Sequence, residues 1–116
     1  MAKGLYNTLT SNEFADSAGI KPEMYTEPVA IQVMKEIGID ISGYKPKKLT
    51  SGMYNSFDIF VIIGHDIDYP IISNKKILVW KIKDPKGKSL ETYRATRNLI
   101  KKHVEKLIIG LEEKYC

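Results

Sequence analysis

Residues 58–63 read DIFVII and residues 75–80 read KKILVW, and these two stretches decide the fold. Each contains an unbroken apolar run instead of alternating apolar and polar positions, so a strand formed there would be buried on both faces. Such strands are typical of parallel sheets, whose two faces are covered by helices. The sequence therefore predicts an α/β fold of three layers, with a parallel sheet flanked by helices.

The amino-terminal part predicts one helix and one further strand. Met1, Leu5 and Leu9 are spaced four apart, which places them on one face of a helix. Residues 13–20, EFADSAGI, are expected to form a short strand that ends near Gly19.

The remaining helices are predicted from their start and stop signals. Thr26 is a candidate N-cap with Pro28 in the first turn, and Gly38 ends that helix. A short helix is expected within residues 49–57, and a long one from Ser89, a good N-cap, towards the carboxyl terminus. The buried face of this last helix is predicted to carry Tyr93, Ile100, Val104, Leu107, Ile108 and Leu111.

Length and composition indicate one domain, residues 1–116, with no linker or repeat. The net charge is +4, which favours anionic partners weakly. Cys116 is the only cysteine, so an intramolecular disulfide is excluded and a reducing compartment, the cytoplasm, is expected. No apolar run is long enough to cross a membrane, and we expect neither a metal nor a cofactor.

Several segments together resemble the low-molecular-weight protein tyrosine phosphatases and their relatives, the thioredoxin-coupled arsenate reductases. They are ADSAGI (15–20), PVAIQVMKEIGIDIS (28–42), FDIFVII (57–63), YP (69–70) and DPKGKSLETYRATRNLIKKHVEKL (84–107). They occur in the family's order and cover almost the whole chain. The resemblance implies the same α/β fold and phosphomonoester or arsenate chemistry.

The resemblance also assigns roles to three residues. Asp84 corresponds to the general acid that protonates the leaving oxygen, and Pro85 stiffens its loop. Ser17 corresponds to a serine that hydrogen-bonds the phosphate-binding loop from the neighbouring strand. The residues alone leave simpler alternatives open, because Asp-Pro commonly starts a turn and a serine at a strand end can satisfy local backbone groups.

The family's first strand and phosphate-binding loop have no counterpart in these 116 residues. That loop is a cysteine, five residues and an arginine; its amides hold the oxyanion and lower the pKa of the nucleophilic thiol. Met1-Ala2 resembles the residues that follow it, and no arginine follows Cys116. The chain is therefore expected to lack a nucleophile, to be inactive alone, and to miss one strand of its sheet.

The reductases in the family carry two further cysteines that relay a disulfide. The corresponding positions here are His65 and Tyr69, which cannot form one, so a thioredoxin-coupled relay is not expected. Phosphatase chemistry would require only the loop and Asp84.

Other functions stay open as alternatives. The chain could be a non-catalytic binding or regulatory module that holds phosphate weakly, or half of a split phosphatase. The exposed sheet edge could accept a second copy or a strand from a partner. A metal site at His65, Asp66 and Asp68 is disfavoured, and His103 is expected at the surface. A nucleic-acid or lipid surface is also disfavoured, because a solvated helix face explains its lysines, Lys101, Lys102, Lys106 and Lys114.

Overall fold

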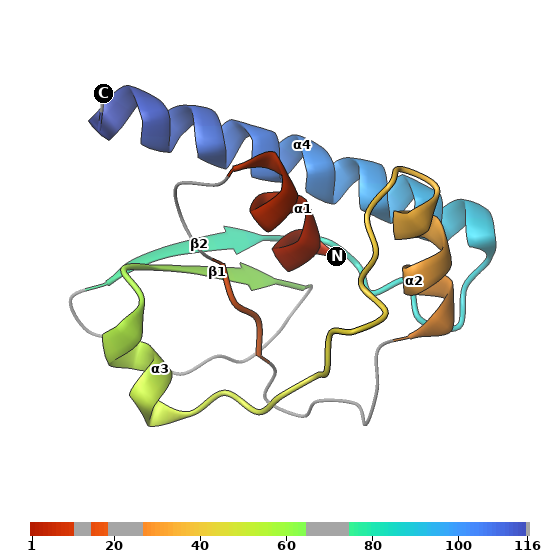
Figure 1. Cartoon of the computed structure of the whole chain (residues 1–116), viewed down its shortest axis with the longest axis horizontal. Helices are drawn as coiled ribbons and strands as arrows, with labels where there is room; N and C mark the ends of the chain where they lie inside the picture. Colours follow the sequence, from red (N-terminus) through yellow and green to blue (C-terminus); the bar gives the residue numbers. More distant parts are fainter. Residues whose placement is uncertain (11–14, 19–26, 65–74, 116) are drawn as a thin grey trace.

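The computed structural model describes residues 1–10, 15–18, 27–64 and 75–115. Within these ranges the helices are α1 (Ala2–Leu9), α2 (Pro28–Lys35), α3 (Ser51–Ser56) and α4 (Leu90–Tyr115), and the strands are β1 (Ile59–Ile63) and β2 (Lys76–Trp80). In Figure 1, α1 and α4 lie above the two strands and α3 lies below them. The predicted α/β fold, a parallel sheet with flanking helices, is confirmed.

The two strands pair in parallel, with Ile59 opposite Lys76 and Ile63 opposite Trp80. The Lys76 amide also donates to the Asp58 carbonyl at 3.3 Å, which extends the ladder by one bond. All five side chains of β1 are half-buried, whereas the sequence predicted burial on both faces. Among the described residues, β1 has a strand neighbour on one side only.

The strand expected at residues 13–20 is not found in its described part. Residues 15–18 have no regular secondary structure, and the rest of that segment lies outside the described residues. A strand requires a ladder partner for its main chain. Here the side chain of Asn7 takes that place, since its oxygen accepts the Ala15 amide at 2.9 Å and its nitrogen donates to the Ala15 carbonyl at 3.0 Å.

Helix α1 confirms part of the predicted amino-terminal pattern. Leu5 is 1 % exposed, but Leu9, expected on the same face, is 45 % exposed because the helix ends there. Gly4 allows close packing, since a Cβ at that position would lie 2.8 Å from Cγ2 of Ile41 and 3.3 Å from Cγ2 of Ile39. This contact sets how closely α1 approaches the segment after α2.

The N-cap of helix α2 lies one residue later than predicted. Glu27 occupies the N-cap position and Pro28 the first helical position, while the predicted cap, Thr26, lies outside the described residues. The fixed φ of proline suits the first turn, where a missing amide costs nothing. The predicted stop is confirmed, because Gly38 has a φ of 80°.

Helix α4 is capped as predicted. Its predicted face is buried at Tyr93, Ile100 and Val104 and half-buried at Leu107, Ile108 and Leu111. The Ser89 hydroxyl accepts the Thr92 amide at 3.3 Å. His103 was expected at the surface but is half-buried, and its ring stacks on Trp80 with 5.0 Å between ring centroids. The helix contributes Tyr93, Ile100 and Val104 to a core that otherwise consists of Leu5, Tyr6, Ala30, Val33, Met34, Ile39, Ile41, Trp80 and Ile82. No helix in the described ranges is both long and apolar enough to span a bilayer.

Candidate active site

The loop that leaves the carboxyl end of β2 holds Asp84 in a tight turn. One carboxylate oxygen, Oδ1, accepts the Lys86 amide at 3.0 Å, and the Lys88 amide donates to the Pro85 carbonyl at 2.9 Å. Gly87 has a φ of 78°, a left-handed conformation that glycine adopts without a steric penalty. The local alternative, a turn started by Asp84, is therefore present. It does not exclude a chemical role for the carboxylate, which is exposed.

Two buried side chains fix this loop to the body of the protein. Pro85 is buried directly beside the exposed Asp84. Ile82, two residues before Asp84, is 5 % exposed. Tyr93, in the first turns of α4, is 3 % exposed. Burial raises the pKa of its phenol, and the carboxylates of Glu27 and Asp84 raise it further. The start of α2, the Asp84 loop and the start of α4 therefore meet at this tyrosine.

Ser17, the third residue assigned by resemblance, is exposed and lies in a segment held by its neighbour Asp16. The Ser17 amide donates to Oδ1 of Asp16, whose carboxylate also pairs with Lys3 at 3.3 Å and with Lys47. Burial of the carboxyl raises its pKa, but the bonds from Lys47, Ser17 and Lys3 outweigh burial and leave the pKa below its ordinary value. In the described ranges no hydrogen bond or ion pair joins Ser17 to Asp84 or Pro85, so the structure does not unite the three as one cluster.

The sheet places the Asp84 loop at a functional edge. Parallel strands end at the same edge, and ligands of open α/β sheets bind beyond these carboxyl ends. In Figure 1 the arrowheads of β1 and β2 point the same way. The amino terminus, marked N, from which α1 starts, is drawn beyond these arrowheads. The carboxyl edge of the sheet, with the Asp84 loop, is thus the candidate active site.

Sequence and structure comparisons identify the family. Residues 1–115 match the family described as low molecular weight phosphotyrosine protein phosphatase. The chain belongs to this family. It is 32% identical over 112 residues to the glutaredoxin arsenate reductase of Synechocystis sp., a match that covers 93% of this chain and 85% of that protein. It is also 32% identical over 108 residues to arsenate reductase 2 of Staphylococcus haemolyticus, covering 90% and 82% of the two chains.

A solved structure supports the same assignment. An arsenate reductase in the phosphate binding state is 31% identical, with a TM-score of 0.82, over 94% of this chain and 86% of that one.

A phosphatase of this family is expected from the resemblance to hold its anion with an arginine. The described part of the chain contains both arginines of the sequence, Arg94 and Arg97.

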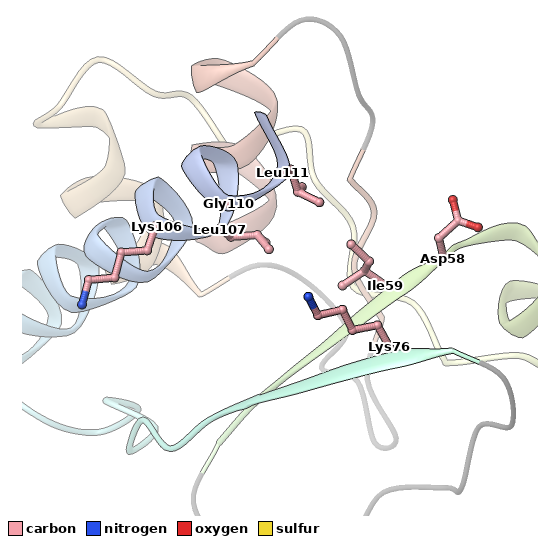
Figure 2. A pocket seen from close by; sticks show the side chains of 7 residues that line it. All are labelled: Asp58, Ile59, Lys76, Lys106, Leu107, Gly110 and Leu111. Atoms are coloured by element: carbon pink, nitrogen blue, oxygen red, sulfur yellow. The ribbon is translucent and has the colours of Figure 1, made fainter. Parts of the chain in front are cut away.

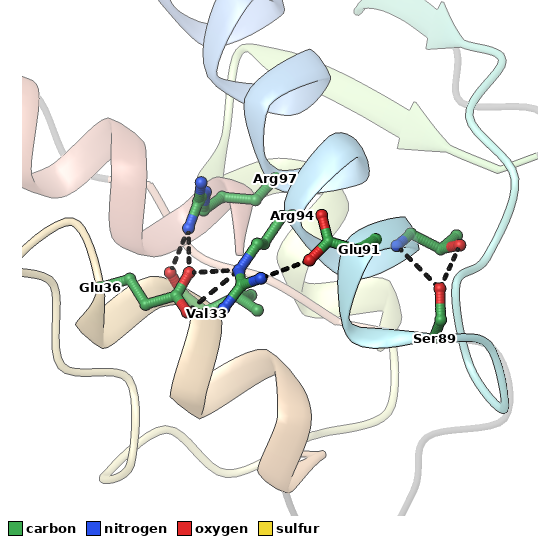
Figure 3. Close-up of polar contacts among 7 residues, drawn as sticks. Val33, Glu36, Ser89, Glu91, Arg94 and Arg97 are labelled. Atoms are coloured by element: carbon green, nitrogen blue, oxygen red, sulfur yellow. Dashed lines mark hydrogen bonds and ion pairs between the residues drawn. The ribbon is translucent and has the colours of Figure 1, made fainter.

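Both arginines are engaged between α2 and α4 (Figure 3). Arg97 is 8 % exposed and donates to the Val33 carbonyl and to Glu36, each at 2.8 Å. Arg94 binds the other oxygen of Glu36 at 2.8 Å and also pairs with Glu91. The bonds from Arg94, and then those from Arg97, lower the pKa of Glu36 against the opposing effect of burial. Neither arginine therefore serves as the anion-binding residue in this arrangement.

The spacing of residues along α4 could have predicted that Arg97 is buried, although a charged residue is ordinarily expected at the surface. Arg97 lies four positions after Tyr93 and three before Ile100, on the face predicted to be buried. A charged residue at such a position requires a partner, since an unpaired buried charge is costly.

A pocket of about 320 Å³ lies away from the Asp84 loop, at the amino ends of the strands. Figure 2 shows Leu107 and Leu111 reaching from α4 towards Lys76 and Ile59, while Lys106 extends away from them. Because β1 and β2 are parallel, this pocket is at the edge of the sheet opposite the candidate active site. The metal ligands considered at His65, Asp66 and Asp68 lie outside the described residues.

Proposed function

We propose that this chain supplies the general acid of a phosphomonoester hydrolase, and that this acid is Asp84. The observation that carries the proposal is the position of Asp84, exposed in a loop anchored by buried Pro85 at the carboxyl edge of the sheet. A carboxyl group there would protonate the leaving oxygen of a phosphate ester as the bond to phosphorus breaks. The family assignment supports the same chemistry.

We further propose that the 116 residues alone do not complete the reaction. Hydrolysis in this family requires a thiolate and an arginine in one phosphate-binding loop, by resemblance. These 116 residues hold one thiol, Cys116, and both of their arginines, Arg94 and Arg97, are bound to Glu36. Without preorganised donors for the oxyanion, the largest catalytic contribution is lost.

Phosphate ester hydrolysis is favoured over arsenate reduction on chemical grounds. Reduction transfers two electrons, and the family's reductases obtain them by oxidising cysteines in sequence. By resemblance, the two positions of the family's relay cysteines hold His65 and Tyr69 here, and neither side chain can form a disulfide. Hydrolysis requires no electrons, so one added thiolate and Asp84 would suffice. A cytoplasmic, reducing location is part of this proposal, since it would keep that thiolate reduced.

Turnover of p-nitrophenyl phosphate tests both statements. The purified chain should show no activity above that of its Cys116→Ser variant. Addition of a peptide with the family's first strand and its Cys-to-Arg loop should then restore weak turnover. With this peptide, Asp84→Asn should slow hydrolysis of an alkyl phosphate much more than that of p-nitrophenyl phosphate, whose phenolate leaves without protonation. Equal slowing of both esters would remove Asp84 from the role of acid.

A second candidate function, a strand-accepting binding module, is favoured by the state of β1. Its side chains, those of Ile59, Phe60, Val61, Ile62 and Ile63, are all apolar and only half-buried, and among the described residues β2 alone pairs with it. An open apolar strand edge is a template for another strand. We expect a strand from a partner, and not a second copy, to occupy it. Amide exchange of β1 that slows with an added apolar strand peptide, in a chain that sediments as a monomer, would support this function; a dimer would contradict it.

A further inference from the structure

The net charge of this protein is concentrated in one loop. Residues 81–88 read KIKDPKGK, with four lysines and one aspartate, and thus carry a net charge of +3 out of +4 for the whole chain. The other residues are nearly balanced in charge. We call residues 81–88 the lysine loop. It is the same loop that presents Asp84 at the candidate active site.

The fold directs these lysines outward. Ile82 is 5 % exposed, and its burial leaves the neighbouring Lys81 and Lys83 on the solvent side, where both are exposed. Beyond Asp84, burial of Pro85 and the turn at Gly87 leave Lys88 exposed as well. The loop is held by the bond from the Lys86 amide to the Asp84 side chain and by the main-chain bond from Lys88 to Pro85, so the lysines are displayed on an ordered support.

Acidic residues close to the loop are already engaged. Asp84 accepts the Lys86 amide, and Glu91 pairs with Arg94. In the described part of the chain, Lys81, Lys83 and Lys88 make no ion pair with any carboxylate. Their charges are therefore available to a ligand that approaches Asp84.

We propose that the lysine loop binds acidic side chains on either side of the phosphorylated residue of a protein substrate. This selects acidic phosphopeptides as the substrate class, and it rests on the proposed function for the phosphoryl group itself. Exposed positive charge beside a reacting group attracts such substrates and accelerates their encounter. The loop carries no arginine for bidentate phosphate binding and no aromatic side chain on which a base could stack, which favours an acidic peptide over nucleic acid.

Binding of fluorescein-labelled peptides to the 116-residue chain, followed by anisotropy at physiological ionic strength, tests the inference without any need for turnover. One peptide carries phosphotyrosine among aspartates and glutamates, a second carries it among serines and glutamines, and a third is the acidic peptide without phosphate. The test variant combines Lys81→Gln, Lys83→Gln and Lys88→Gln. Lys86 is kept because its charge also acts on the buried Tyr93 phenol.

The matched control combines Lys45→Gln, Lys48→Gln and Lys102→Gln, which removes the same charge from exposed sites elsewhere. We expect the loop variant to weaken binding of both acidic peptides about three- to thirtyfold, as the loss of three exposed ion pairs allows. The control variant should change the affinity for both acidic peptides by less than about twofold, because salt screens distant charges. Circular dichroism should show both variants folded.

Three results would overturn the inference: no preference for the acidic peptides, equal losses in both variants, or tighter lysine-dependent binding of a DNA oligonucleotide. The proposed function fails separately. Turnover of p-nitrophenyl phosphate involves no flanking residues, so its failure with the added strand-and-loop peptide would leave the acidic-peptide surface intact. Restored turnover without lysine-dependent binding would refute only this inference.

Discussion

The side-chain amide of Asn7 binds the main chain of Ala15 in both directions, as a strand neighbour would. It accepts the Ala15 amide at 2.9 Å and donates to the Ala15 carbonyl at 3.0 Å. The bonds join α1 to the segment that contains Asp16 and Ser17. This segment was expected to be a strand, and these two bonds attach it to α1 instead.

Asn7→Asp should lower the free energy of unfolding by about 1–3 kcal/mol. The aspartate can accept the Ala15 amide but cannot donate to the Ala15 carbonyl, so two oxygens would face each other. Urea unfolding followed by circular dichroism measures the change, with Thr8→Ser, an exposed neighbour, as control. Equal stability of parent and Asn7→Asp would show that the side chain does not hold this segment.

Two substitutions of Asp84 separate its structural role from its proposed chemical role. Asp84→Asn keeps an oxygen for the Lys86 amide and should leave stability nearly unchanged. Asp84→Ala removes this bond at an exposed site and should cost about 0.5–1 kcal/mol of unfolding free energy. Thermal unfolding of both variants checks the difference. Equal destabilisation by Asn and Ala would mean that the charge, and not the turn, is what the fold requires.

Arg97 and Arg94 bind the same glutamate but should differ in their effect on stability. Arg97→Met leaves the Val33 carbonyl without its buried donor and should cost about 2–4 kcal/mol. Arg94→Met acts at a side chain that is 35% exposed, and should cost about 1 kcal/mol or less. Urea unfolding of the two variants measures this contrast. A larger loss at Arg94 would contradict the assignment of Arg97 as the buried link between α2 and α4.

Alanine should have opposite effects at two helical glycines. Gly4→Ala would bring a Cβ to 2.8 Å from Ile41 and should destabilise the fold by about 1–3 kcal/mol. Gly110→Ala meets nothing within 4 Å and should stabilise α4 by about 0.5–1 kcal/mol through helix propensity. Melting temperatures that move in the same direction for both would show that close packing at Gly4 does not control the position of α1.

Asp16 should make part of the stability depend on pH. Its pKa in the folded protein lies below the ordinary value of 3.8, so the stabilisation is fully present above pH 3.8 and is lost as pH falls through the folded pKa. The difference in unfolding free energy between the parent and Asp16→Asn should therefore be largest above pH 3.8 and shrink towards lower pH. Guanidinium titrations across this range measure it. A difference that grows in acid would reverse the sign and refute the ion pairs with Lys3 and Lys47.

The sequence by itself determined the elements whose signals are local. Each of these signals depends on residues within a few positions of one another. They are the apolar runs of β1 and β2, the stop at Gly38, the cap at Ser89 and the turn at Asp84. The same local segments carry the resemblance that the family assignment confirmed. The candidate site could be predicted to that extent, as a loop with an aspartate after a buried strand.

Only the tertiary structure decided which groups pair across long separations. Residues 15–18 meet Asn7 in place of a strand, Arg97 meets Val33, and His103 stacks on Trp80. No periodic pattern encodes these contacts, because a pattern records that a position is buried and not which group will lie against it. Burial of Ile82 and Pro85 likewise turns the lysines outward only once the loop is folded against the core. Local chemistry thus fixed the elements, and long-range packing fixed their partners.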